Sequence, residues 1–106
     1  MSMAALLLAD GRFPGGGHAH SGGLEAAVAD RSVDPGCPFP TFEAFLAGRL
    51  TTTGTIDAWL AACACHGADE EVLDAEADAR CPSAALRLAS RRLGRGLRRA
   101  AGRSFP

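Results

Sequence analysis

Apolar side chains recur at steps of three and four residues in four stretches of this chain, and this spacing constrains the fold more than any other sequence feature. An α-helix has about 3.6 residues per turn, so the spacing gathers apolar side chains on one face. One such stripe consists of Phe42, Phe45, Leu46 and Leu50, and another of Leu86, Ala89, Leu93, Leu97 and Ala100. No segment has the pattern of a convincing strand. The sequence therefore predicts an all-α helical array in a single domain over residues 1–106.

Glycine- and proline-rich segments separate the expected helices. These helices cover residues 3–9, 22–31, 41–52, 56–66, 69–80 and 82–101. Ser21 or Gly22 is expected to cap the second helix, and Thr41 the third. Glycine content predicts a loop over residues 10–22, and three prolines predict an extended linker over residues 32–40.

Charge is divided sharply along the chain. All twelve acidic residues and three arginines lie in residues 1–78, whereas residues 79–106 hold eight arginines and no acid. The last helix, which Pro82 is expected to open, has a basic face. This face consists of Arg87, Arg91, Arg95 and Arg98, and Arg92 and Arg99 complete it. Such a face is either solvated or binds a partner; the net charge of −1 and the lack of interleaved aromatic residues argue against nucleic acid.

Neither secretion nor membrane insertion is expected. The apolar run at residues 4–9 is too short for a signal sequence, and no stretch approaches the length of a membrane span. The cytoplasm is therefore the expected location. There the cysteines at positions 37, 63, 65 and 81 are expected to be reduced, and no C-x-x-C motif supports a zinc ribbon.

The glycine-rich segment Asp10–Glu25, DGRFPGGGHAHSGGLE, fails the common catalytic motifs. Gly23 stands where a phosphate-binding P-loop has lysine, and Leu24 stands where it has serine or threonine. The run around Ser21 lacks the strand that the nucleophile elbow of a hydrolase requires. Neither nucleotide binding nor hydrolase chemistry is therefore expected at this segment.

His18 and His20 are the candidate metal ligands. In an extended segment, residues two apart point to the same side, and imidazole suits nickel, copper and zinc. Two ligands make only a weak, transient site, and the alternative is that both rings pack the loop onto neighbouring helices. Cys63, Cys65 and His66 have a crowded metal-like spacing, but in a helix residues two apart point to different sides.

Residues 6–28, LLLADGRFPGGGHAHSGGLEAAV, resemble the N-terminal signature of the urease accessory protein UreF family. The matching positions are Leu8, Ala9, Asp10, Pro14, Gly16, Gly17, Ser21, Gly23, Leu24 and Glu25. Gly11 and Phe13 depart from the serine and leucine that are usual there.

A second block, residues 73–101, is similar to another segment of the same family. Its matching positions are Arg87, Ala89, Ser90, Gly94, Arg95, Leu97 and Arg98. Ala85 stands where glutamate is common, and Gly96 is unusual within a helix. The two blocks span nearly all of this chain but only about the first half of a family member.

The resemblance implies an all-α homodimer, similar to the first half of the UreF fold and without catalytic machinery. It implies work with UreD (also called UreH) and the GTPase UreG to insert nickel into the urease apoprotein, with no tightly bound cofactor and nickel only in transit. The implied structural and partner-binding loop consists of Asp10, Pro14, Gly16, Gly17, Ser21, Gly23, Leu24 and Glu25. The implied basic partner face is Arg87, Arg91, Arg95 and Arg98, and the transient nickel ligands are His18 and His20.

The alternative is a small metal carrier without a GTPase partner. It would use His18 and His20, with Cys63, Cys65 and His66 as further ligands. Equilibrium dialysis with nickel distinguishes the two, because a carrier binds tightly and stoichiometrically whereas a scaffold does not.

Overall fold

The computed structural model describes residues 2–36 and 38–105, and the side chains of all of these except 18 and 38–40. Every regular element within these ranges is helical, which confirms the all-α class. The chain divides into two compact units, which are described separately below. They consist of Met1–His20 with Cys81–Pro106, and of Ser21–Arg80.

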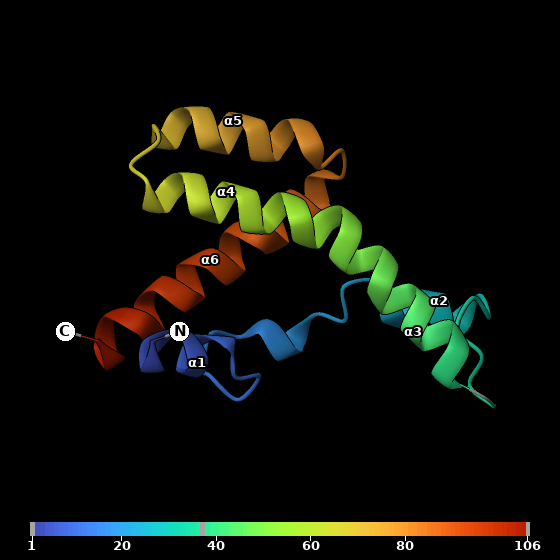
Figure 1. The fold of residues 1–106 in the computed structure, drawn as a ribbon. Helices are drawn as coiled ribbons and strands as arrows, with labels where there is room; N and C mark the ends of the chain where they lie inside the picture. The colour runs from blue at the N-terminus through green and yellow to red at the C-terminus, as the bar shows by residue number, and fades with distance from the viewer. Residues whose placement is uncertain (1, 37, 106) are drawn as a thin grey trace. The chain divides into compact units, whose positions relative to one another are not determined.

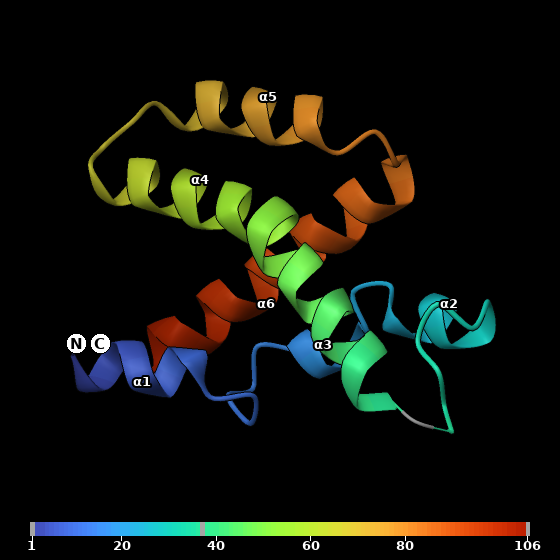
Figure 2. The same cartoon turned by 45° about the vertical axis from the view of Figure 1, so that its right-hand side comes forward.

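The first unit holds two helices that are far apart in sequence. They are α1 (Met3–Ala9), whose bounds are as predicted, and α6 (Ala84–Ser104). The hydroxyl of Ser2 caps α1 by accepting the Ala5 N–H at 3.2 Å. Both ribbon views place α1 beside the C-terminal part of α6 (Figures 1 and 2). The loop that follows α1 is therefore brought to α6 as well.

The start of α6 differs from the prediction. Ser83 is its N-cap, with Oγ accepting the Leu86 N–H at 3.3 Å, so Pro82 precedes the cap and does not occupy the first turn. Arg87 reinforces this end, because its guanidinium donates to the carbonyls of Cys81 at 2.7 Å and Pro82 at 3.0 Å. The backbone that enters α6 is thus tied to the helix itself.

The second unit contains four α-helices. They are α2 (Leu24–Ala29), α3 (Pro38–Arg49), α4 (Thr55–Cys65) and α5 (Glu70–Arg80). Helices α4 and α5 form an antiparallel hairpin (Figure 1). The Arg80 guanidinium lies 5.5 Å from the centre of the Trp59 ring, a cation–π distance that joins the two helices.

The predicted break between residues 52 and 56 is wrong, because α3 continues into α4 through a π-helical segment, Leu50–Gly54. Three threonine hydroxyls at this junction bond to carbonyls of the preceding turn. The hydroxyls of Thr51, Thr52 and Thr55 donate to carbonyls four or five residues earlier, at 2.6–2.8 Å. Gly54 allows its backbone to approach the Arg49 carbonyl closely. The threonine–glycine run was expected to interrupt the helix, but it is helical in the structure.

The linker and the third helix also begin and end differently from the prediction. Helix α3 begins at Pro38, so the last residues of the predicted linker 32–40 form its first turn, where a missing proline N–H costs nothing. Thr41 is consequently not the N-cap; its hydroxyl accepts the Asp34 N–H at 2.9 Å instead. The prolines thus start a helix here and do not extend the linker.

Helix α2 is shorter than predicted because left-handed residues flank it. Gly22 and Gly23 have φ values of 63° and 96°, and Gly23, not Ser21 or Gly22, is the N-cap. Arg31, with φ at 65°, ends the helix. The predicted stop at Gly67 is confirmed, since its φ of 80° and the flanking hydrogen bonds close α4 with a Schellman motif.

The described residues bury little apolar surface. Only Ala27 and Val33 are buried, at 8% and 3% exposure, and the Val33 N–H donates to the Ala27 carbonyl. By contrast, Leu50 is 69% exposed and Trp59 is half exposed. Among the described residues, no helix is both long and apolar enough to cross a bilayer.

We expect this chain to self-associate in solution, because exposed apolar faces are covered by association. Light scattering coupled to gel filtration, at tens of micromolar, should give a mass above the monomer's 10.9 kDa. Leu50→Gln should shift the population toward monomer, whereas Thr53→Gln on the same segment should not. A monodisperse monomer of the unmodified chain at that concentration would contradict the expectation.

Candidate functional site

The loop after α1 packs against α6 by a close approach of two backbones within the first unit. A Cβ added at position 96 would lie 2.9 Å from the Gly15 carbonyl oxygen, too close for any residue but glycine without a shift. A Cβ at position 15 would lie 3.2 Å from Leu97 Cδ1. Gly15 and Gly96 thus let the loop lie directly on the helix, and each belongs to one of the two sequence blocks described above.

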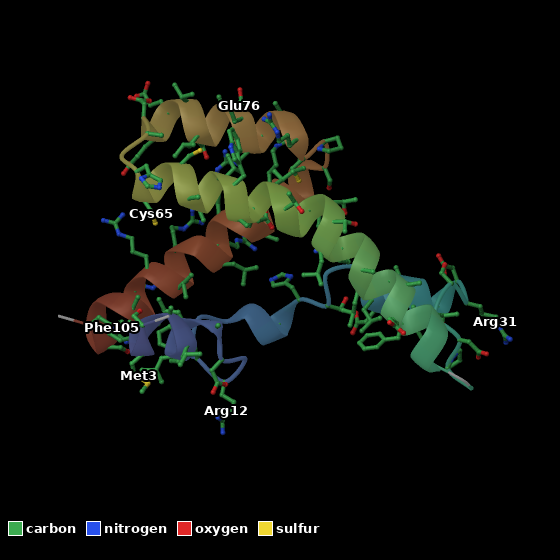
Figure 3. The ribbon with its side chains drawn as sticks, viewed as in Figure 1. Met3, Arg12, Arg31, Cys65, Glu76 and Phe105 are labelled. Carbon is green, nitrogen blue, oxygen red and sulfur yellow. The ribbon has the colours of Figure 1, made fainter. Side chains whose placement is uncertain are left out.

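Asp10 and Arg12 shape the first turn of this loop. Asp10 Oδ1 accepts the Arg12 N–H at 2.8 Å, and the Arg12 guanidinium donates to both Asp10 oxygens at 3.1 and 2.8 Å. These bonds hold the pKa of Asp10 below its usual value, the side-chain hydrogen bond more than the backbone one. The Arg12 side chain is 91% exposed and points outward (Figure 3). The pair organises a surface turn and does not form a buried site.

Gly16 and Gly17 form the next turn. Gly16 has φ at 85° and is the N-cap of a 3₁₀ turn, Gly17–Ala19. Because His18 lies inside this turn, the extended backbone that would place His18 and His20 on the same side is absent, and that premise is wrong. The His18 side chain lies outside the described part of the structure, and His20 is exposed.

The second half of the glycine-rich signature belongs to the other unit. Ser21, Gly23, Leu24 and Glu25 form the start of α2. The Ser21 hydroxyl accepts the Glu25 N–H at a long 3.4 Å, and the exposed Glu25 carboxylate lies in the first turn, where negative charge is favourable. The loop predicted as one site is therefore divided, with Asp10, Pro14, Gly16 and Gly17 on the α6 side.

The predicted basic face of α6 is also uneven. Arg95 and Arg98 are exposed, whereas Arg87 and Arg91 are half-buried. Arg87 is engaged by the carbonyls that precede α6. Given 3.6 residues per turn, these four arginines lie roughly opposite Leu93, Gly96 and Ala100, which line the loop side of the helix.

Sequence reasoning assigned Arg92 and Arg99 to the basic face of the last helix, but it missed Arg103 and the loop that lies beside all three arginines. A groove of about 460 Å³ runs between the loop and α6. Its basic side chains are Arg92, Arg99 and Arg103, and its loop side is formed by Pro14, Gly15 and Gly16. The available signal was Gly96, since a glycine inside a helix costs about 1 kcal/mol relative to alanine and usually has a packing reason.

The described cysteines form no metal site with His20 or His66. Cys63 is half-buried and Cys65 exposed near the end of α4, and both are free thiols, as is Cys81. Cys37 lies outside the described residues. Among the described side chains, no group of three or more histidine, cysteine or acidic residues is placed to hold a metal ion.

Comparison with known proteins places similarity across the whole chain. The sequence profile of the UreF family matches residues 40–106. Three proteins named "Urease accessory protein UreF" are similar over nearly the full chain. They come from Mycolicibacterium vanbaalenii (48% identical, covering 99% of this chain and 50% of the relative), Mycobacterium tuberculosis H37Rv (49%, covering 99% and 49%) and Mycobacterium sp. JLS (47%, covering 95% and 47%). The chain thus spans about half the length of these relatives, and no solved structure matches it.

Gly96→Ala should loosen the loop despite the better helix propensity of alanine. Its Cβ would meet the Gly15 carbonyl, so the loop must shift, whereas Gly102→Ala meets nothing within 4 Å and should gain about 1 kcal/mol of helix stability. Hydrogen exchange of residues 10–17 should quicken in the first variant only. Unchanged exchange in Gly96→Ala would contradict the close approach.

Asp10 should titrate below its usual pKa of about 3.9 in an NMR-monitored titration. Because folding lowers this pKa, the contribution of Asp10 to stability is present above the unfolded-state value and is lost as pH falls through the folded-state value. Arg12→Ala should return the pKa toward normal, and Arg31→Ala should leave it unchanged. An unshifted pKa in the unmodified chain would rule out the Asp10–Arg12 turn in solution.

Proposed function

We infer that this chain, which belongs to the UreF family, acts in urease maturation as an accessory protein and not as a catalyst. Membership follows from the family match over residues 40–106. It confirms the resemblance that rested on two sequence blocks, and the relatives are named for an accessory protein of urease and not for the enzyme.

The observation that carries the proposal is the meeting of the two blocks in one unit. Gly15, within the N-terminal signature, lies against Gly96, within the second block, through backbone contact alone. Backbone packing of this kind creates an ordered surface without a buried polar centre, which suits protein binding better than bond-making chemistry. We propose that this surface engages UreD (UreH) or UreG during nickel insertion into urease apoprotein, in a cytoplasmic complex built on a homodimer.

Nickel is proposed to pass through this complex without tight binding to this chain. A stable site for a borderline metal usually needs three or four ligands. We propose His18 and His20 as transient contacts for nickel, since two imidazoles alone make a weak site.

Complementation tests the proposed role directly. In a strain that lacks its own UreF, we expect the 106-residue chain alone to leave urease inactive, while a full-length relative restores activity. The reason is the apolar surface left uncovered, including Leu86 at 63% exposure on α6. Immunoblotting must show equal amounts of both proteins. Restoration by the short chain alone would refute the expected insufficiency but would support the accessory role, whereas failure of the full-length relative would invalidate the strain.

Replacing both loop histidines separates scaffold from carrier. The double variant His18→Ala/His20→Ala should reduce co-purification with UreD and UreG more than it reduces nickel binding in equilibrium dialysis. The expected cause is that a glycine-rich loop needs packed side chains to be ordered, whereas two imidazoles make a poor nickel site. His66→Ala serves as the control on α4. A large loss of nickel binding with intact co-purification would favour the carrier.

A further inference from the structure

The groove between the loop and α6 is a concave, basic surface within the first unit. It has arginines along one side, namely Arg92, Arg99 and Arg103, and an apolar floor that includes Leu93 and Ala100. All of these residues belong to the same compact unit, so the groove is defined within it. Its loop side carries no charged side chain, since it is formed by Pro14, Gly15 and Gly16.

The side chains of these three arginines are not paired with an acid. In the part of the chain that the structure describes, no side-chain hydrogen bond or ion pair joins Arg92, Arg99 or Arg103 to another residue. Apart from Asp10, which is already engaged by Arg12, the unit contains no acidic residue and eight arginines, so its formal net charge is +7. The unpaired guanidinium groups of Arg92, Arg99 and Arg103 therefore favour an anionic occupant.

The spacing of the arginines indicates the size of that occupant. Arg92 and Arg103 are eleven positions apart in sequence. At about 1.5 Å of rise per residue, they span about 16 Å along α6. An extended peptide covers that distance with roughly five residues, at about 3.3 Å each. The guanidinium group of arginine is planar and can bind one carboxylate in a bidentate geometry, through two parallel hydrogen bonds.

We propose that this groove binds an acidic peptide segment of a protein partner, with its carboxylates on Arg92, Arg99 and Arg103 and an apolar residue on Leu93 and Ala100. Nucleic acid fits less well, because no aromatic side chain lines the groove for base stacking. This proposal deepens the proposed function. It rests on that function only for the identity of the cellular protein that supplies the acidic segment. The groove shares Arg92 and Arg99 with the basic face predicted from sequence, whereas Arg103 and the loop side of the groove were not predicted.

Fluorescence anisotropy tests the groove with a defined probe. The probe is a fluorescein-labelled peptide in which about six glutamates alternate with serine and leucine residues. Increasing amounts of the full chain are added to this peptide. The groove variant is Arg92→Gln/Arg99→Gln/Arg103→Gln, and the matched control Arg31→Gln/Arg95→Gln/Arg98→Gln removes the same charge elsewhere in the chain. Circular dichroism must show that all three proteins are equally helical.

We expect the groove variant to bind about tenfold more weakly than the unmodified chain, as three exposed ion pairs predict, and the control to change less than about threefold. A peptide with glutamine in place of glutamate should not bind. Equal loss in both variants, or no binding of the acidic peptide, would overturn the proposal. Tighter, groove-dependent binding of a single-stranded oligo-dT would also overturn it, in favour of nucleic acid.

Co-purification with UreD and UreG and binding of the acidic peptide fail independently. Peptide binding without co-purification would leave the groove supported and the urease role without support. Co-purification without peptide binding would leave the accessory role standing and remove the groove from it.

Discussion

The contact between the Gly15 carbonyl and the backbone at Gly96 determines how the first unit is arranged. At this point neither chain segment has a side chain to separate the two backbones, so the loop lies directly on α6. The position of Pro14 and Gly16 over the helix follows from it, and so does the groove that the loop forms with the arginines of α6. Gly96 weakens α6 as an isolated helix, but it allows the close packing of the loop that forms the groove.

Charge follows the division into units. The unit that contains α6 has a formal net charge of +7, and the unit that contains α2 to α5 has one of −8. Concentrated charge of one sign attracts oppositely charged partners and is screened by salt. The arginines of α6 have different roles according to their position on the helix. Arg87 donates hydrogen bonds to the backbone that precedes α6, whereas Arg92 and Arg99 line the groove.

The second constraint on this chain is that it buries little apolar area and leaves apolar side chains exposed. Ala27 and Val33 are the only buried residues in the described ranges, while leucines on α6 and at the α3–α4 junction remain open to solvent. Helices gain most of their stability from packing an apolar face against neighbours. The chain spans about half the length of its relatives, and a protein whose apolar faces are open is suited to assembly with other proteins, as the proposed accessory role requires.

The sequence by itself determined the helical class, the family and most helix positions, because 3.6-residue periodicity and short motifs are local properties. It failed where tertiary context decides: the threonine–glycine run became π-helix through hydroxyl bonds to the preceding turn, and the prolines at 38–40 began α3. Only the tertiary structure divided the glycine signature between two units and placed Arg92, Arg99 and Arg103 beside the loop. Residues 15 and 96 are far apart in sequence, and no local pattern states that their backbones meet.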